Sequence, residues 1–517
     1  MRRIRCLPLL AILAAPVAAP AQEIRLGIEL FPSSLDPHWH NFGGNKGFSA
    51  HLYEPLVALD AGQRPVASLA TAWTAIDSTT WRFTLRPGVQ FHDGAALTSA
   101  DVAHTLRRAA QVPGSPSSFA VYLRQITAVE TPDAATILVR TAAPFPLMPI
   151  YLSQVPIIRA TAATTPDFDA GRAAIGTGPF RLTAFARGDQ VSMARNDGYW
   201  GEPAPWARAT IRSMGQPATR VAALLSGAVD AIDAAPPQDL PRLRADSRLR
   251  VSALVAPAVA GFRMDMMERV PPGIRGPDGQ PLTRNPMTDI RVRQAVSLGI
   301  NREAIVERTM GGQARVASQL MTPGAWGYAP AIQPTPYDPE RARTLLAEAG
   351  WPQGFQMSIG CQNNRFVNDE QICQAVAQML TRIGVRTTVD AMPHALHVNR
   401  SRNHEFSFWT GIWNNETGEP ASALVTMLAT VDEARGRGQF NRGRYSNPQF
   451  DSLLDAALAE LDDAKREALL IEATGIAFRD VALIALHHQM HLWAHRAGRS
   501  HAPRLDGYTR AMDFRPE

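Results

Sequence analysis

Residues 406–420 combine side chains that can hold a polar organic solute. The stretch opens as an expected strand, in which Phe406, Phe408 and Ile412 are apolar and smaller residues stand between them. Directly after Trp413 it turns polar, with two amides, a carboxylate, a Thr-Gly pair and a second carboxylate. A buried strand that ends in hydrogen-bonding groups is one way to line a ligand pocket. The alternative is a strand, a surface turn and a helix cap.

The side chains of this stretch suggest two kinds of contact. Asn414 and Asn415 can each donate and accept hydrogen bonds, to a peptide backbone or to sugar and amide oxygens. Trp413 and Trp409 offer stacking faces, and core packing is the alternative, more so for Trp409. Glu419 precedes a proline and is expected to start a helix rather than to touch ligand.

A second candidate follows the strand predicted over residues 24–30. The loop after this strand carries Trp39, His40 and Asn41, and an aromatic ring with an imidazole and an amide can contact a ligand there. His38 and His40 together could also suggest a metal, but the sequence shows no third ligand.

Three histidines near the C-terminus, His487, His488 and His491, allow a metal or metal-chelate interpretation. The apolar residues around 481–484 instead favour a buried strand, so neither a metal nor any other cofactor is expected.

The N-terminus has the pattern of a cleaved signal peptide. Three arginines precede an apolar run over residues 7–19, and Ala19-Pro20-Ala21 fits a cleavage site that leaves Gln22 first. The run is short for a membrane span, and Cys6 lies before it, where a lipid-anchor cysteine does not stand. We expect an exported, soluble, periplasmic protein; a retained signal anchor is the alternative.

The net charge and the length limit the possible ligands and the number of domains. Without residues 1–21 the net charge falls from +5 to +2, with 49 basic against 47 acidic residues, which gives no argument for nucleic acid or anionic membrane. The remaining 496 residues exceed one core, so two or three domains are expected. In an oxidising compartment Cys361 and Cys373 are expected to form a disulfide, with two free buried thiols as the alternative.

Local signals predict several elements. Helices are expected after Thr98, Asp289, Asp338 and Asn368, each of which is a good cap. Residues 341–389 alternate helix, loop, strand, helix and strand, which is typical of an α/β lobe.

Several blocks in one order resemble a known family. They cover residues 69–73, 81–94, 97–102, 176–180, 195–200, 220–230 and 289–302. These blocks closely resemble the extracytoplasmic solute-binding proteins of peptide-type ABC importers, which include dipeptide-, oligopeptide- and nickel-binding proteins. The resemblance runs from about residue 24 to the C-terminus.

The resemblance implies an α/β fold of the two-lobed, type II periplasmic binding protein kind, with an added subdomain in the first lobe. We expect lobe 1 at 22–45, 176–265 and 482–517, the added subdomain at 46–175, and lobe 2 at 266–481.

The resemblance also implies a site and a role. In peptide binders of this kind an aspartate three residues after the tryptophan matching Trp413 pairs with the ligand's amino group, and Glu416, one methylene longer, stands there. Trp39, His40 and Asn41 would face it from lobe 1. The implied role is capture of a short peptide or other amine-bearing solute by a monomer, and its delivery to an inner-membrane permease with cytoplasmic ATPases.

Alternatives from other classes stay open. The same role for a metal chelate or an oligosaccharide is one, and a receptor that signals without transport is another. An exported hydrolase is a third, although the sequence has no Gly-x-Ser-x-Gly, His-Glu-x-x-His or phosphate-binding loop.

Overall fold

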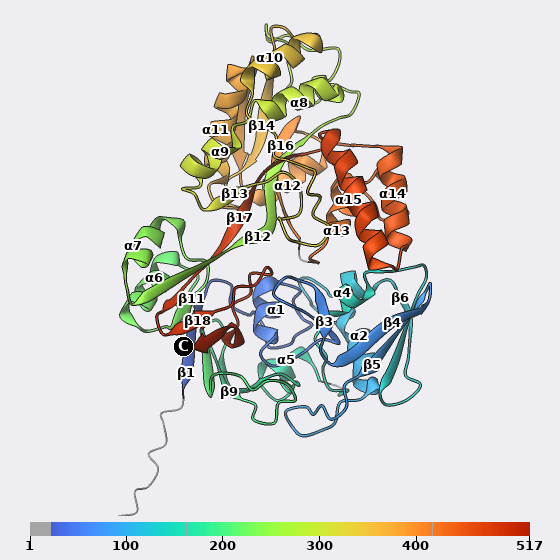
Figure 1. The fold of residues 1–517 in the computed structure, drawn as a ribbon, viewed down its shortest axis with the longest axis vertical. Coiled ribbons are helices and arrows are strands. Elements are labelled where there is room, and N and C mark those ends of the chain that lie inside the picture. The colour runs from blue at the N-terminus through green and yellow to red at the C-terminus, as the bar shows by residue number, and fades with distance from the viewer. Residues whose placement is uncertain (1–21, 162, 416) are drawn as a thin grey trace, which may run out of the picture.

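The structure is a computed structural model that describes residues 22–161, 163–415 and 417–517. It has two lobes, one above the other in Figure 1, and one eleven-stranded sheet runs through both. The strand order is β15-β14-β16-β12-β17-β11-β1-β10-β9-β8, with β13 beside β17. This two-lobed α/β architecture is the fold class that the sequence predicted.

Lobe 1, the lower lobe in Figure 1, is built around β1 (Glu23–Ile28), which pairs in parallel with β10 and β11. Ile24, Leu26 and Ile28 recur at every second position and are buried, as the period of a strand requires. Its other elements are α1 (Gly43–Ser49), α5 (Thr165–Asp169), β8 (Phe180–Ala186), β9 (Gln190–Arg195), β10 (Arg208–Ser213), α6 (Pro217–Ser226), β11 (Ala231–Ile232), η1 (Pro237–Asp239), α7 (Leu240–Ala245), β18 (Arg499–His501), η5 (Ala511–Asp513) and β19 (Phe514–Pro516).

A four-stranded antiparallel sheet, in the order β4-β5-β7-β6, forms a subdomain beside lobe 1. Along β5 (Thr80–Leu85) the side chains of Trp81, Phe83 and Leu85 are buried, whereas Arg82 and Thr84 are exposed. The other elements are β2 (Val57–Leu59), β3 (Pro65–Ala67), β4 (Ala70–Asp77), α2 (Ser99–Ala109), α3 (Ala120–Leu123), β6 (Ile126–Glu130), β7 (Thr136–Thr141) and α4 (Met148–Leu152).

The subdomain has its own core, which extends from Leu56 to Ile157. Phe48, Tyr53 and Ile158 instead pack in the core of lobe 1. From this packing we propose subdomain limits closer to 56–157 than to the 46–175 expected from the sequence.

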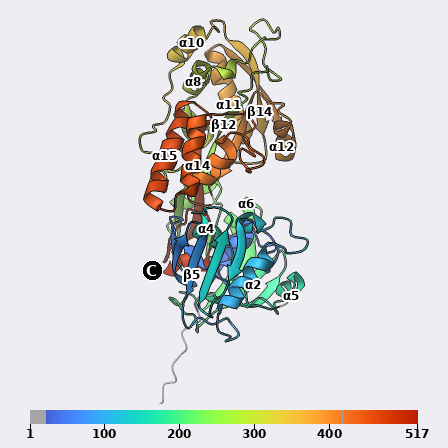
Figure 2. The ribbon, with the colours of Figure 1, turned by 90° about the vertical axis from the view of Figure 1, so that its right-hand side faces the viewer.

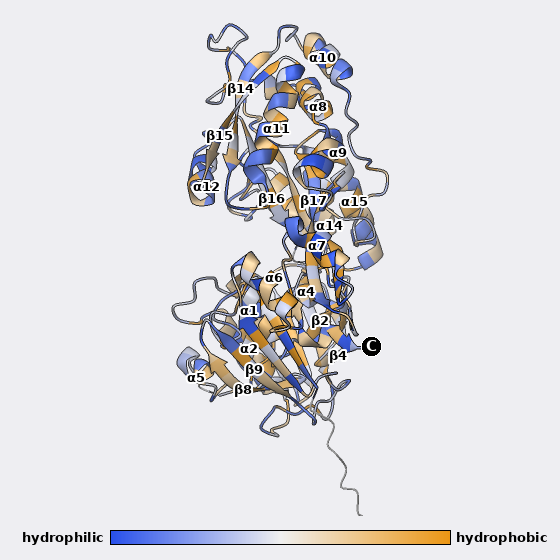
Figure 3. Cartoon of the chain, turned by 90° about the vertical axis from the view of Figure 1, so that its left-hand side faces the viewer, coloured by the Kyte–Doolittle hydropathy of each residue, from blue (hydrophilic) through white to orange (hydrophobic). Residues whose placement is uncertain are grey.

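Lobe 2 carries a parallel trio of strands, in which β14 (Phe355–Gln362) pairs with β15 and β16. The helices around it alternate between hydrophilic and hydrophobic colour in Figure 3, as amphipathic helices on a core do. Its other elements are η2 (Pro286–Thr288), α8 (Ile290–Leu298), α9 (Arg302–Ala304), η3 (Ile305–Thr309), β13 (Ala314–Val316), α10 (Pro339–Glu348), α11 (Asp369–Arg382), β15 (Val385–Met392), α12 (His394–Arg402), β16 (Phe408–Asn414), α13 (Ala421–Ala423), η4 (Leu424–Leu428), α14 (Pro448–Ala459) and α15 (Asp463–Arg479).

A disulfide joins Cys361 at the end of β14 to Cys373 in α11, with Cα atoms 6.4 Å apart. This is the pairing expected from the sequence. It fastens the first turns of a lobe 2 helix to the strand that precedes it.

Two long strands, β12 (Leu249–Met264) and β17 (Ile484–Arg496), connect the lobes, which Figure 2 shows stacked on this connection. They pair antiparallel in both lobes, with a register shift between Val255 and Val259. Each therefore belongs to lobe 1 at one end and lobe 2 at the other. In the described ranges no helix is long and apolar enough to cross a membrane.

Candidate ligand-binding cleft

Two adjoining hollows lie between the lobes, with volumes of about 560 and 530 Å³. They share five lining residues, namely Leu30, Gly43, His491, Asp506 and Tyr508, and so form one cleft. Both volumes fall within the range of small-molecule sites, about 300–1,000 Å³.

The cleft lies at the carboxyl ends of parallel strands in both lobes. Glu29 follows β1 and Asp233 follows its parallel neighbour β11, and both line the first hollow. Arg365 follows β14 closely and Asn415 follows β16, and both line the second hollow. Open α/β sheets place their ligands at such ends.

The second hollow is rich in cations. Lys46, Arg365, Arg504 and Arg510 all line it. Arg504 pairs with Asp506, 2.8 Å between Nη2 and Oδ2, and Arg510 pairs with Asp513 at 2.6 Å, whereas Arg365 is exposed. This half of the cleft therefore favours an anionic group such as a carboxylate.

The first hollow carries carboxylates. Glu29 and Asp233 line it together, and Asp233 accepts a hydrogen bond from the Glu29 N–H at 2.8 Å. Burial raises the pKa of Asp233 to about 7. Arg220 partly offsets this charge, because its Nη2 lies 3.5 Å from Glu29 Oε1. An amine entering this hollow would gain the charged partner that Asp233 lacks.

The stretch singled out in the sequence supplies the lobe 2 side of the second hollow. Asn414 ends β16 and is exposed, whereas Asn415 is 1% exposed, and both line the hollow. The Asn415 N–H donates to Pro257 O at 2.9 Å, which fastens this stretch to β12. Its Oδ1 is buried and has no partner among the described residues, so it can accept a hydrogen bond from a ligand.

The two tryptophans pack in lobe 2. Trp409 is 4% exposed and packs with Met392 and Phe406 in a small core cluster. Trp413 is half-buried and meets Phe440 edge to face at 6.2 Å between ring centres. Neither is among the residues that line the two hollows. Glu416, the proposed amine anchor, lies outside the described residues.

Glu419 forms a buried ion pair behind the same stretch. Its Oε2 lies 3.1 Å from Arg466 Nη1 of α15, and the two side chains are 0% and 3% exposed. It also accepts a hydrogen bond from the N–H of Ala421, the first residue of α13, so it supports the helix start predicted for it. The ion pair therefore anchors the start of α13, directly after the stretch that lines the cleft.

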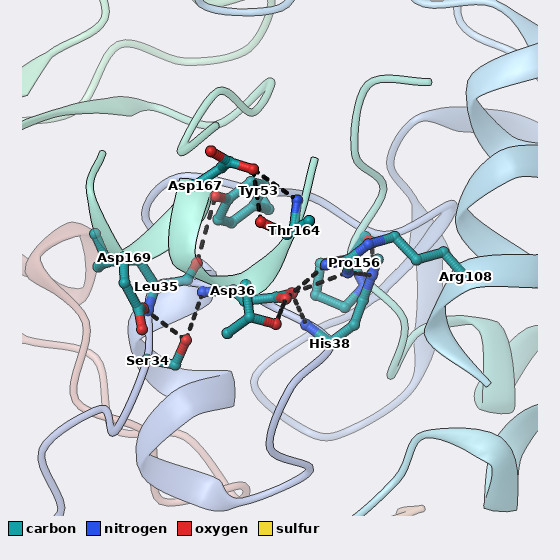
Figure 4. A network of polar contacts seen from close by, with 11 residues as sticks. Ser34, Leu35, Asp36, His38, Tyr53, Arg108, Pro156, Thr164, Asp167 and Asp169 are labelled. Carbon is teal, nitrogen blue, oxygen red and sulfur yellow. Dashed lines mark hydrogen bonds and ion pairs between the residues drawn. The ribbon is translucent and has the colours of Figure 1, made fainter. Parts of the chain in front are cut away.

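On the lobe 1 side, the loop after β1 is held by buried polar contacts (Figure 4). Asp36 Oδ2 accepts from Arg108 Nη2 of α2 at 2.6 Å, and the His38 ring contacts Pro156 O at 2.7 Å. Burial lowers the pKa of His38 to about 4. These contacts make His38 a structural residue of this loop.

Trp39, His40 and Asn41 lie on this loop but line neither hollow. The His40 ring stacks on Phe42 at 5.0 Å between centres, and Asn41 Oδ1 accepts from Tyr122 OH at 3.4 Å. Phe42, the next residue, does line the second hollow. The loop thus lines the cleft at Leu30, Phe42 and Gly43, and a contact of Trp39, His40 or Asn41 with ligand stays a prediction.

The three C-terminal histidines lie on β17, a buried strand as expected. His487 and His488 are 0% and 1% exposed, and burial lowers the pKa of each to about 4. His491 lines both hollows. Within the described ranges no group of three or more His, Cys, Asp or Glu side chains is placed to hold a metal.

Sequence reasoning missed most charged residues of the cleft. Glu29, Asp233, Arg365, Arg504 and Arg510 stand in segments far apart in the chain. A signal was present for Glu29, which comes directly at the end of the first strand, but none of the others belongs to a recognisable spacing.

A family model, known sequences and solved structures match this chain over most of its length. Residues 64–434 match the family model described as bacterial extracellular solute-binding proteins, family 5 Middle. The glutathione-binding protein GsiB of Salmonella typhimurium (strain LT2) is 30% identical over 494 residues, covering 93% of this chain and 91% of that protein. The glutathione-binding protein GsiB of Escherichia coli (strain K12) is 27% identical over 484 residues, covering 92% and 90%.

Two solved structures share the fold. HbpA2 from Haemophilus parasuis superimposes with a TM-score of 0.85 at 22% identity, covering 96% of this chain and 100% of that one. The unliganded open form of MppA, a periplasmic murein tripeptide binding protein, gives a TM-score of 0.81 at 21% identity, covering 96% and 98%. With a family model matched over most of its length, the chain belongs to family 5 of the bacterial extracellular solute-binding proteins.

Proposed function

We propose that this chain is the substrate-binding component of an ABC importer, which captures a short peptide or another amine-bearing organic solute between its lobes. The loaded protein then docks on an inner-membrane permease driven by cytoplasmic ATPases. We further propose that it acts as a periplasmic monomer after cleavage at Ala21, binds no nucleic acid, and binds its solute without turning it over.

The main support for this proposal is that side chains of opposite charge line the two hollows of the cleft. One hollow presents Glu29 and Asp233, and the adjoining one presents Arg365 with other cations. A peptide has a cationic amino end and an anionic carboxyl end, so it can satisfy both halves at once. The glutathione-binding relatives support a peptide-type solute.

Closure of the lobes would complete the site. The connecting strands β12 and β17 form a narrow bridge on which the lobes can rotate. On one side the lobes already touch, since Arg64 Nη2 lies 3.8 Å from Asp463 Oδ2. Rotation about this side would bring the strand ends of the two lobes onto opposite faces of the solute.

The test is calorimetric titration of the mature chain with glutathione, di- to pentapeptides, oligosaccharides and nickel–histidine. We expect heat of binding from peptides. Arg365→Ala should weaken peptide binding about tenfold, which corresponds to about 1.4 kcal/mol. Arg382→Ala, which removes an exposed arginine outside the cleft lining, is the matched control and should bind as the parent does.

The role of Glu416 as an amine anchor needs its own variants. Glu416→Gln should weaken peptides with a free amino group but leave N-acetylated peptides unaffected, whereas the exposed Glu433→Gln should change neither. Equal weakening of both peptide forms would contradict the anchor. Binding of sugars or chelates alone would overturn the peptide assignment, and release of cleaved peptide would favour a hydrolase.

A further inference from the structure

Three buried arginines in this chain, Arg220, Arg293 and Arg302, donate hydrogen bonds mainly to backbone carbonyls, whereas others such as Arg466 pair with a carboxylate. Arg302 is 2% exposed and donates to the carbonyl oxygens of Ala485 and Ser297 at 2.9 and 3.0 Å. Arg220 and Arg293 likewise donate to three carbonyl oxygens each. Such bonds offset the cost of removing a guanidinium from water.

Arg263 in lobe 2 is half-buried, and in the described ranges its guanidinium has neither kind of partner. It lies on β12 opposite Trp409, and its Nη2 donates to the thioether Sδ of Met427 at 2.8 Å. A thioether is a weak acceptor, and in the described ranges no carboxylate lies within 4.0 Å of this guanidinium. Burial, together with the nearby charge of Arg442, lowers the pKa of Arg263 to about 10.

Arg442 lines the same small hollow as Arg263. Its Nη1 donates to Ser401 Oγ, and burial and Arg402 lower its pKa. The hollow has no acidic residue in its lining and leaves about 10 Å³, room for about one water-sized particle. Most of its other lining residues are apolar, among them Met264, Met427 and Leu483.

The neighbouring strand makes room for the Arg263 side chain. A Cβ on Gly411 of β16 would lie 1.5 Å from Arg263 Nη1 and 2.7 Å from its Cζ. Glycine at position 411 therefore leaves the space that the end of the Arg263 side chain occupies over β16.

We propose that Arg263 and Arg442 together bind one small inorganic anion, of halide size, inside lobe 2. Arg263 and Arg442 are half-buried neighbours whose charges repel each other, and the hollow that they line has no carboxylate. An anion between them supplies charge-assisted hydrogen bonds to both. The volume of the hollow suits a monatomic anion and is too small for a peptide side chain. The site is separate from the solute cleft, whose lining it does not share.

The melting temperature of the mature chain tests this directly. Sodium chloride replaces sodium gluconate stepwise at constant ionic strength, without any solute. Because the anion binds only the folded state, we expect the melting temperature to rise by about 2 °C when chloride reaches ten times its dissociation constant.

Arg263→Met is the decisive variant. In gluconate it should melt at the parent's temperature or above, because an uncompensated charge has been removed, and it should not respond to chloride. Arg293→Met is the matched control: it removes a buried arginine that is bonded to carbonyls, so it should melt lower in both salts and keep the full chloride response.

Bromide-soaked crystals should in addition show an anomalous peak between the two guanidinium groups. Equal chloride responses in the parent and Arg263→Met would overturn the proposal. So would an equal loss of melting temperature by Arg263→Met in both salts, which would make the arginine purely structural. A response to acidic peptides but not to halides would overturn the assignment to a free anion.

Discussion

Substituting His487 by leucine should make the protein more resistant to acid. His487 lies on the connecting strand β17, opposite Ala260 of β12, and is 0% exposed. Neither ring nitrogen has a hydrogen-bond partner among the described residues. Burial, with a smaller contribution from His488, lowers the pKa of His487 to about 4.

The sign of the effect follows from this depressed pKa. In the unfolded chain the ring takes up its proton near its ordinary pKa of about 6.5, whereas in the folded protein it does so only near 4. The unfolded state therefore binds the proton first, and stability is lost as the pH falls from about 6.5 to 4. At pH 5 the difference amounts to about 2 kcal/mol of unfolding free energy.

Urea unfolding of the parent and His487→Leu at pH 8 and pH 5 measures this loss. At pH 8 the ring is neutral, and the leucine variant should be as stable as the parent or about 1–3 kcal/mol more stable, because it buries no unpaired nitrogen. At pH 5 its advantage should be larger by about 2 kcal/mol.

Gln489→Leu, a change of a polar side chain on the same strand that does not titrate, is the control. Its difference from the parent should be the same at both pH values. If the advantage of His487→Leu is also the same at pH 8 and pH 5, the ring is not held neutral by burial and the reasoning fails.

Three further predictions concern the surroundings of the cleft. Glu419→Gln leaves Arg466 without its buried anionic partner and should lower the unfolding free energy in urea by about 3–5 kcal/mol. The double variant with leucine at both positions should recover most of this loss, and a double variant as unstable as Glu419→Gln would refute the reasoning. Replacing both disulfide cysteines by serine opens a loop of 12 residues' separation and should cost about 2–3 kcal/mol relative to the oxidised parent, whereas the reduced parent should match the variant. Gly418→Ala should weaken solute binding about tenfold by calorimetry, since Gly418 has φ +68° and its Cβ would lie 2.8 Å from Gln63 O of the subdomain. Gly436→Ala, at φ +66° without that contact, should bind normally.

Helix starts could be predicted from the sequence because a cap acts within one turn. Asp289 and Asp338 accept hydrogen bonds from the N–H groups of Arg291 and Arg341, and helices α8 and α10 begin directly after them. In α2 the carboxylate of Asp101 accepts from the N–H at the preceding cap position at 2.8 Å. Each of these needs only residues two or three positions apart.

The face on which a side chain lies could not be predicted in the same way. Trp409 and Asn414 belong to one strand, yet Trp409 packs in the core and Asn414 lines the cleft. The two residues stand an odd number of positions apart, so their side chains lie on opposite faces of the sheet although β12 pairs with both. A period of two gives two faces but does not say which one meets the other lobe.

The charged residues of the cleft could not be predicted from the sequence, for a related reason. Glu29 and Asp233 are about 200 residues apart, and they meet because β1 and β11 are parallel neighbours whose ends coincide. Arg365 joins them from lobe 2 only through the crossing of β12 and β17. Strand pairing over such distances produces no local sequence pattern from which these contacts could be recognised.

The connecting strands also determine how binding and movement are coupled. Pro257 and Ala258 lie at the register shift of β12, line the second hollow, and hold Asn415 through the hydrogen bond from its N–H to Pro257 O. We expect a rotation of the lobes to change the backbone here, because the pairing of β12 with β17 is interrupted at this shift and again between Ala260 and Gly261. The residues that would move during closure are therefore the ones that position Asn415 against lobe 1. For this reason solute affinity and the lobe angle should change together when this segment is altered.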